Sequence, residues 1–143
     1  MHLIQRMVAE KSHLSADQRV TLHAERRQFL KRRWRGIAED GSEFGFDLES
    51  RLVDGSVILN ENGRDYIVRQ LPERVYEIGL TSPEFAALIA WKVGNLHLPA
   101  QILDTTLRVL HDQAMTQLLE REGWKFTEPK VVFTPMKSMA HAP

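Results

Sequence analysis

The spacing of apolar residues changes near Pro72, and this change limits the folds open to the 143-residue chain. Before Pro72, apolar and polar residues alternate, as in residues 20–25, and a period of two is typical of half-buried strands. The dipeptides Asp40-Gly41 and Asn62-Gly63 favour tight turns between neighbouring strands. Residues 1–72 are therefore expected to form a small antiparallel β domain.

The second half contains two helix signals separated by strand-like segments. Ser82-Pro83-Glu84 is a typical helix start, because serine caps free N–H groups and proline is tolerated in the first turn. Gly94-Asn95 favours the end of that helix, while Asp112 and Gly123 bracket a second one. Strands are expected before, between and after the helices, the last over residues 124–132. The order βαββαβ is that of the ferredoxin-like fold.

These patterns predict an α+β protein with three parts. Residues 1–72 form the β domain, residues 73–135 the ferredoxin-like domain, and residues 136–143 a mobile tail without a core pattern. Residues 25–35 support two interpretations, because their apolar side chains fit either a strand or one face of a helix.

Composition excludes several classes of protein. Lys plus Arg and Asp plus Glu both total 19, so bulk charge does not draw the chain to nucleic acid or anionic membranes. The absence of cysteine excludes disulfides, thiolate metal sites and a cysteine nucleophile. No apolar run is long enough to span a membrane, and the first residues lack the pattern of a secretory signal. We expect a soluble, cytoplasmic protein.

Catalytic motifs are absent from the sequence. There is no Gly-x-Ser-x-Gly elbow, no glycine-rich phosphate loop followed by lysine, and no His-Glu-x-x-His pair. The chain is therefore not expected to be an enzyme.

A basic run provides the main alternative function. Between positions 19 and 35 it contains seven Lys and Arg residues and two aromatic ones, Phe29 and Trp34, a mixture that suits RNA. The ferredoxin-like half, however, lacks the aromatic RNP1 pattern, and charged edge strands also prevent aggregation of sheets. A peptide- or RNA-binding adaptor is thus the alternative interpretation, with nucleic acid disfavoured.

Three of the six histidines are candidate metal ligands. His97 follows the expected end of the first helix, where unpaired carbonyls form a weakly negative pole that favours a cation; a bond from its ring to a carbonyl is the alternative. His111 precedes Asp112, which either accepts a hydrogen bond from that ring or simply begins the second helix. His141 lies in the tail, where no packing demand explains an imidazole.

The residues around His97 resemble a known family. Gly94-Asn95-Leu96-His97-Leu98-Pro99-Ala100-Gln101 is similar to the Gly-Asn-x-His-x-Pro-x-Gln segment of the UreE family of urease accessory proteins, which deliver nickel. Residues 110–119 and 132–135 resemble that family's second helix and closing strand, and residues 14–19 and 48–55 its first domain. The resemblance extends over nearly the whole chain.

The resemblance implies a cytoplasmic homodimer with a β domain similar to peptide-binding domains of heat-shock co-chaperones. One Ni(II) ion, the cargo, is held on the two-fold axis by His97 of both subunits, and His141 of the tail adds a ligand. Gln113 stands where the family often has a second histidine, so His111 alone represents that peripheral site. Delivery to apo-urease passes through the urease accessory GTPase and its partners.

Metal preference follows from the donor atoms. Imidazole nitrogens bind Ni(II), but Zn(II) and Cu(II) can bind the same site, since the Irving–Williams order places copper above nickel. Histidine ligates only when neutral, so metal affinity is expected to fall as the pH drops toward about 6.5.

Overall fold

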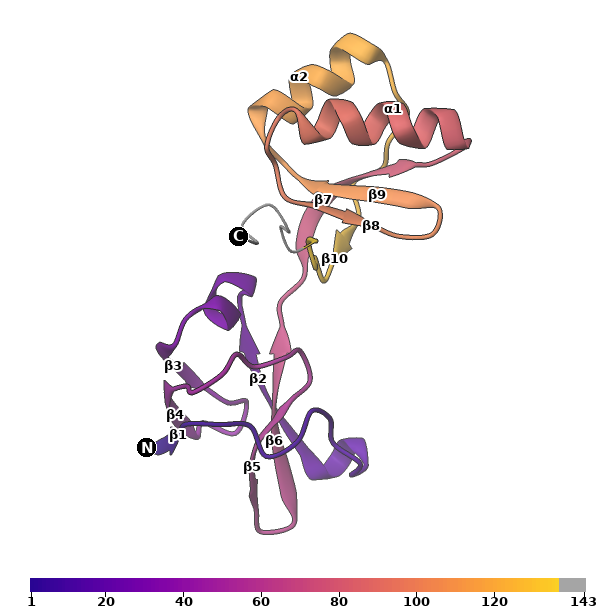
Figure 1. The fold of residues 1–143 in the computed structure, drawn as a ribbon. Helices are drawn as coiled ribbons and strands as arrows, with labels where there is room; N and C mark the ends of the chain where they lie inside the picture. The colour runs from indigo at the N-terminus through magenta and orange to yellow at the C-terminus, as the bar shows by residue number, and fades with distance from the viewer. Residues whose placement is uncertain (137–143) are drawn as a thin grey trace. The chain divides into compact units, whose positions relative to one another are not determined.

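The computed structural model describes residues 1–136 in two compact units, Met1–Leu71 and a second that begins at Pro72 (Figure 1). The expected mobile tail lies outside the described residues apart from Met136, and so does His141. The α+β class is confirmed, because both units contain sheets and the second adds two α-helices.

The first unit contains two three-stranded sheets. One has the order β1-β4-β3, and the other the order β2-β6-β5. Their bounds are β1 (His2–Ile4), β2 (Arg19–Ala24), β3 (Arg33–Ile37), β4 (Glu43–Asp47), β5 (Val57–Glu61) and β6 (Arg64–Gln70). A short 3-10 helix, η1 (Ala16–Gln18), precedes β2.

The pairing in these sheets is mixed, not purely antiparallel. The pairs β3–β4 and β5–β6 are antiparallel hairpins whose turns contain Gly41 and Asn62-Gly63 at positive φ, as predicted. The pairs β1–β4 and β2–β6 are parallel. Parallel partners require a long crossover connection, so the local turn signals that identify hairpins do not reveal them.

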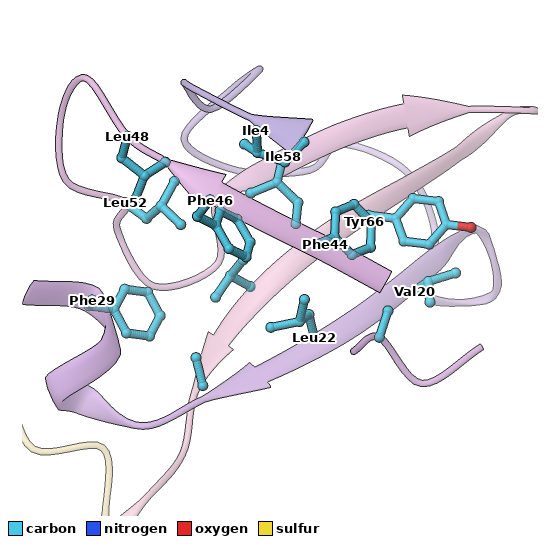
Figure 2. Close-up of a cluster of buried hydrophobic side chains, with 13 residues drawn as sticks. Ile4, Val20, Leu22, Phe29, Phe44, Phe46, Leu48, Leu52, Ile58 and Tyr66 are labelled. Carbon is cyan, nitrogen blue, oxygen red and sulfur yellow. The ribbon is translucent and has the colours of Figure 1, made fainter. Parts of the chain in front are cut away.

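Residues 25–35 combine both interpretations. The 3-10 helix η2 (Arg26–Leu30) buries Phe29, and β3 then begins at Arg33. Phe29 joins the core of the first unit, where alternate residues of β2, β4 and β6 face one another (Figure 2). Gly36 of β3 lies so close to this core that an added Cβ would meet Leu22 Cδ2 at 2.9 Å.

The second unit has the predicted ferredoxin-like topology. Its elements are β7 (Glu73–Gly79), α1 (Pro83–Gly94), β8 (Ala100–Ile102), β9 (Thr106–Leu110), α2 (Gln113–Glu122) and β10 (Lys130–Val131). The antiparallel sheet has the order β10-β7-β9-β8, which is fourth, first, third, second along the unit. Both helices lie on the same face of this sheet (Figure 1).

Local signals determine the helix ends. The Ser82 side chain accepts a hydrogen bond from Phe85 N–H, and Asp112 accepts one from Ala114 N–H. Gly123 adopts φ 67° at the end of α2. The expected last strand over 124–132 is wrong in length, since only Lys130–Val131 forms one; Pro129 has no N–H to donate to a ladder.

Candidate metal centre

His97 lies in the turn that ends α1. Its N–H donates to Gly94 O at 3.1 Å, and its φ is 57°, in the left-handed region. The residue is exposed, and its ring makes no hydrogen bond or ion pair within residues 1–136. The backbone of this turn is therefore bonded while the imidazole stays free to bind a ligand, which excludes the alternative of a ring bonded to a carbonyl.

The left-handed backbone at His97 is unusual for a residue with a side chain. Steric repulsion between Cβ and the following carbonyl costs roughly 1–2 kcal/mol in this region, although histidine tolerates it better than most residues. Glycine would remove that cost. Such outliers cluster at functional sites, so the geometry makes His97 a candidate ligand.

One face of α1 is apolar but uncovered. Ile89 and Val93 are buried in the core of the second unit, whereas Leu88 is 42% and Trp91 65% exposed. Ala87, Ala90 and Gly94 extend this exposed face toward the C-terminal end of the helix. A helix that is apolar around its whole circumference is normally buried, so this face indicates an interaction surface that ends beside His97.

His111 is held by neighbouring side chains. Its ring stacks on Tyr76 with a centroid distance of 4.1 Å, and its Nε2 lies 3.2 Å from Glu128 Oε1. Asp112 begins α2, and its side chain accepts from Ala114 N–H. His111 and Glu128 together form a two-donor cluster, one nitrogen and one oxygen, at the surface.

The two histidines flank the same end of the β8–β9 hairpin. Ala100 pairs with Val109, so the residues before β8 and those after β9 leave the sheet at one end. Within the described part of the chain, no group of three or more His, Asp or Glu side chains is placed to hold a metal ion. Among residues 1–136, His97 is therefore not part of a cluster of three or more such donors.

The last described residues lie beside β8. Met136 N–H donates to Ala100 O at 2.8 Å, and Thr134 N–H donates to Gln101 Oε1 at 3.2 Å. Met136, the last described residue, therefore lies beside Ala100, which is three residues after His97 in the sequence. The sequence analysis assigned no role to Gln101. In the structure Gln101 lies on β8 opposite Arg108 of β9.

Three basic residues of the run form ion pairs with acids. Arg27 Nε lies 2.6 Å from Glu25, while Arg32 and Arg33 both contact Asp47. The hydrogen bond from Arg33 and the charge of Arg32 hold the pKa of Asp47 below its usual value. These pairs reduce the free positive charge that RNA would contact.

An open groove of about 460 Å³ lies over the β1-β4-β3 sheet. Its lining includes Leu3, Trp34, Arg35 and Gly45.

Neither helix within residues 1–136 has the length and apolar character needed to traverse a bilayer.

Comparison with known proteins shows which proteins this chain is similar to. A family model described as the C-terminal domain of the UreE urease accessory protein matches residues 73–142. The urease accessory protein UreE of Chelativorans sp. (strain BNC1) is 36% identical over 107 residues, covering 73% of this chain and 68% of that protein. UreE of Bacillus cereus (strain ATCC 10987 / NRS 248) is 33% identical over 115 residues, covering 78% and 76%. UreE of Pseudomonas putida (strain GB-1) is 30% identical over 138 residues, covering 94% and 82%.

The fold and these matches define an accessory chaperone of urease maturation that is not itself an enzyme. Within that class, the chain belongs to the UreE family of urease accessory proteins. The predicted family and the absence of an enzymatic role are thereby confirmed.

Proposed function

We propose that this protein is a nickel carrier that binds Ni(II) through His97 of two copies and donates the ion to apo-urease. The observation that carries the proposal is the exposed imidazole of His97, which has no partner within residues 1–136 and stands in left-handed backbone at the end of an uncovered apolar helix face. Family membership supplies the context of urease maturation.

A second copy of the chain is the proposed partner of the exposed α1 face. In a two-fold symmetric dimer the same patch meets itself, so one residue per chain becomes two ligands. Burying Leu88 and Trp91 against their counterparts would bring the two helix ends, and hence both His97 residues, toward the axis. Two imidazoles form an open shell, since Ni(II) takes about four to six donors, and an open shell suits transfer to a receiving protein.

The tail is proposed to add a ligand. Met136 is held at Ala100, and His141 follows five residues later. Five extended residues reach roughly 17 Å, whereas Ala100 and His97 are three residues apart and at most about 11 Å distant. His141 is thus within reach of an ion at His97. His111 is proposed as a peripheral ligand, with Glu128 beside it as an oxygen donor.

Zn(II) and Cu(II) are proposed to compete for the same nitrogens, so selection for nickel depends on the partners. Those partners are the urease accessory GTPase and the complex of apo-urease with its accessory proteins, and the compartment is the cytoplasm. Nitrogen ligands alone do not distinguish these ions in favour of nickel.

Calorimetric titration of nickel tests the assignment of His97. We expect about one tightly bound ion per dimer in the wild type, and loss of that binding in both His97→Ala and His97→Asn. The asparagine variant is included because asparagine tolerates left-handed backbone, so it removes the imidazole without adding strain. His13→Asn, at another exposed histidine, is the matched control. Unchanged tight binding in His97→Asn would refute the proposal.

The alternative function, a peptide- or RNA-binding adaptor, rests on the groove over the β1-β4-β3 sheet. It predicts salt-dependent RNA binding that disappears when Arg32 and Arg33 become alanine. Filter-binding at two salt concentrations distinguishes it from the nickel carrier, which predicts no such binding.

A further inference from the structure

A small hollow in the first unit lies between two segments that the β3–β4 hairpin brings together. It has a volume of about 220 Å³ and is lined by residues 30–32 on one wall and residues 48–51 on the other. A hydrogen bond from Leu48 N–H to Arg32 O, at 2.9 Å, joins the two walls. We call this feature the basic hollow.

Each wall of the basic hollow contains one apolar residue. The 3-10 helix η2 buries Phe29 in the core of the first unit and leaves the next residue, Leu30, 55% exposed. Consecutive residues of a 3-10 helix point about 120° apart, so the two side chains cannot both enter the core. Leu48, on the other wall, belongs to the buried cluster shown in Figure 2. The hollow therefore offers apolar surface to a ligand, mainly from Leu30.

Each wall also contains a cation without an acidic partner. Lys31 and Arg51 are exposed, and their side chains make no hydrogen bond or ion pair within residues 1–136. Arg32 shares the Asp47 carboxylate with Arg33, at distances of 3.0 and 3.3 Å. Three basic residues thus line the hollow, and two of them have no counter-charge.

The carboxylate in the lining does not neutralise these charges. Glu49 is bound by Arg6, whose Nη2 lies 3.3 Å from Glu49 Oε2. The charged residues of the lining and their ion-pair partners comprise five basic and two acidic ones: Arg6, Lys31, Arg32, Arg33 and Arg51, with Asp47 and Glu49. The whole chain is neutral, so this excess is local. A local excess of one sign attracts a ligand of the opposite sign.

The basic hollow does not have the aromatic surface that single-stranded RNA uses. RNA sites combine basic residues with exposed rings on which bases stack. The described lining contains no aromatic residue, and both aromatic residues of the basic run pack elsewhere. Phe29 is buried, and Trp34 stacks on Phe46 with a centroid distance of 4.0 Å. Unmatched cations beside an apolar residue instead fit carboxylates on either side of an apolar side chain.

We propose that the basic hollow is a docking site for a short acidic segment of another protein, in which carboxylates flank one apolar residue. The apolar side chain packs on Leu30, and the carboxylates pair with Lys31 and Arg51. The site lies within the first unit and uses neither His97 nor nickel. Exposed ion pairs are individually weak and screened by salt, so the interaction is expected to be reversible and to disappear at roughly 1 M salt.

Fluorescence anisotropy with a labelled peptide, Glu-Asp-Leu-Asp-Glu, tests the site on the full chain at low salt. A second peptide replaces the acids by Gln and Asn, and a third replaces leucine by alanine. We expect the neutral peptide to bind about tenfold more weakly, because each exposed ion pair contributes up to about fivefold. The alanine peptide should bind at least about threefold more weakly, because it loses apolar contact area.

Matched variants of the protein test the named residues. Lys31→Gln combined with Arg51→Gln should weaken binding of the acidic peptide about tenfold. Lys11→Gln combined with Arg64→Gln removes the same charges from exposed positions of the same unit outside the hollow, and this control should bind like the wild type. Leu30→Ala should weaken binding about threefold, since it removes the apolar contact. Urea unfolding checks that each variant is folded.

Charge reversal and NMR give two further readouts. Lys31→Glu combined with Arg51→Glu should bind the peptide Lys-Lys-Leu-Lys-Lys and no longer the acidic one. In the wild type, the acidic peptide should shift the amide resonances of the two walls. The same shifts should appear in His97→Asn, so failure of the nickel assignment and failure of the docking site are distinguishable.

Several outcomes would overturn the docking site. Equal affinity of the wild type and the Lys31/Arg51 variant shows that these cations do not bind the peptide, and equal loss in the Lys11/Arg64 control shows attraction by overall charge. Octauridylate that binds more tightly than the peptide, and depends on Lys31 and Arg51, identifies RNA as the ligand. Amide shifts of the two walls on raising the protein concentration without peptide identify a second copy of the chain as the occupant.

Discussion

Trp91 offers the sharpest test of the proposed homodimer. It is 65% exposed on α1, and taking about 250 Å² for a tryptophan side chain, roughly 160 Å² of it is open to water. At about 25 cal/mol per Å², burying this surface stabilises a dimer by up to about 4 kcal/mol per copy. Truncations of interface tryptophans commonly cost 2 kcal/mol or more each.

We therefore expect Trp91→Ala to cost at least about 4 kcal/mol over the two copies, which corresponds to a roughly thousandfold rise in the dimer dissociation constant. Sedimentation velocity over a range of concentrations, with EDTA present to remove bridging metal, measures this constant. Urea unfolding of the dissociated variant checks that the domain stays folded, because Trp91 lies outside the buried core.

Leu3→Ala is the matched control for this experiment. Leu3 is 77% exposed but belongs to the first unit, so its truncation is expected to leave the dimer unchanged. A dissociation constant that is the same in Trp91→Ala and wild type would refute the assignment of α1 to the interface. Equal weakening by Leu3→Ala would do so too.

Three further predictions concern stability, each measured by urea unfolding. His97→Gly should stabilise the chain by about 0.5 kcal/mol while abolishing nickel binding, because relief of left-handed strain exceeds the entropy cost of glycine; a destabilised variant would contradict this. Tyr66→Phe should cost about 1 kcal/mol at pH 7, since the Tyr66 hydroxyl donates to Asp40 at 2.6 Å. That hydrogen bond holds the pKa of Asp40 below its ordinary value. The difference in unfolding free energy between wild type and Tyr66→Phe should therefore be full above about pH 4 and disappear as the pH falls through the lowered pKa. A difference that does not depend on pH would exclude this origin. Gly36→Val should cost about 2 kcal/mol, because its Cβ meets the fully buried Leu22, and a neutral effect would show that β3 can shift.

Local chemistry was enough to predict much of the second unit. The caps Ser82 and Asp112 and the left-handed Gly123 form bonds within a few residues, so their sequence neighbours reveal them. The hairpin turns of the first unit are local in the same way. The Gly-Asn-x-His motif indicated His97 as a metal ligand, and this role stays a prediction.

Other features depend on residues far apart in the chain. The parallel pairing of β2 with β6 joins residues more than forty positions apart, and no turn signal connects them. A full strand was predicted over residues 124–132, but Pro129 cannot donate to a ladder, and only Lys130 and Val131 pair with β7.

The sequence by itself determined which segments become helices and turns, and that an imidazole stands at the end of α1. Only the tertiary structure decided that Val93 is covered while Trp91 is open, and that Gln101 meets Thr134. Both faces of α1 are apolar in the sequence, so burial depends on which one the sheet occupies. The hydrogen bond of Gln101 exists because the residues that follow β10 cross β7 and β9 to reach β8, and such a crossing is a property of the packed sheet.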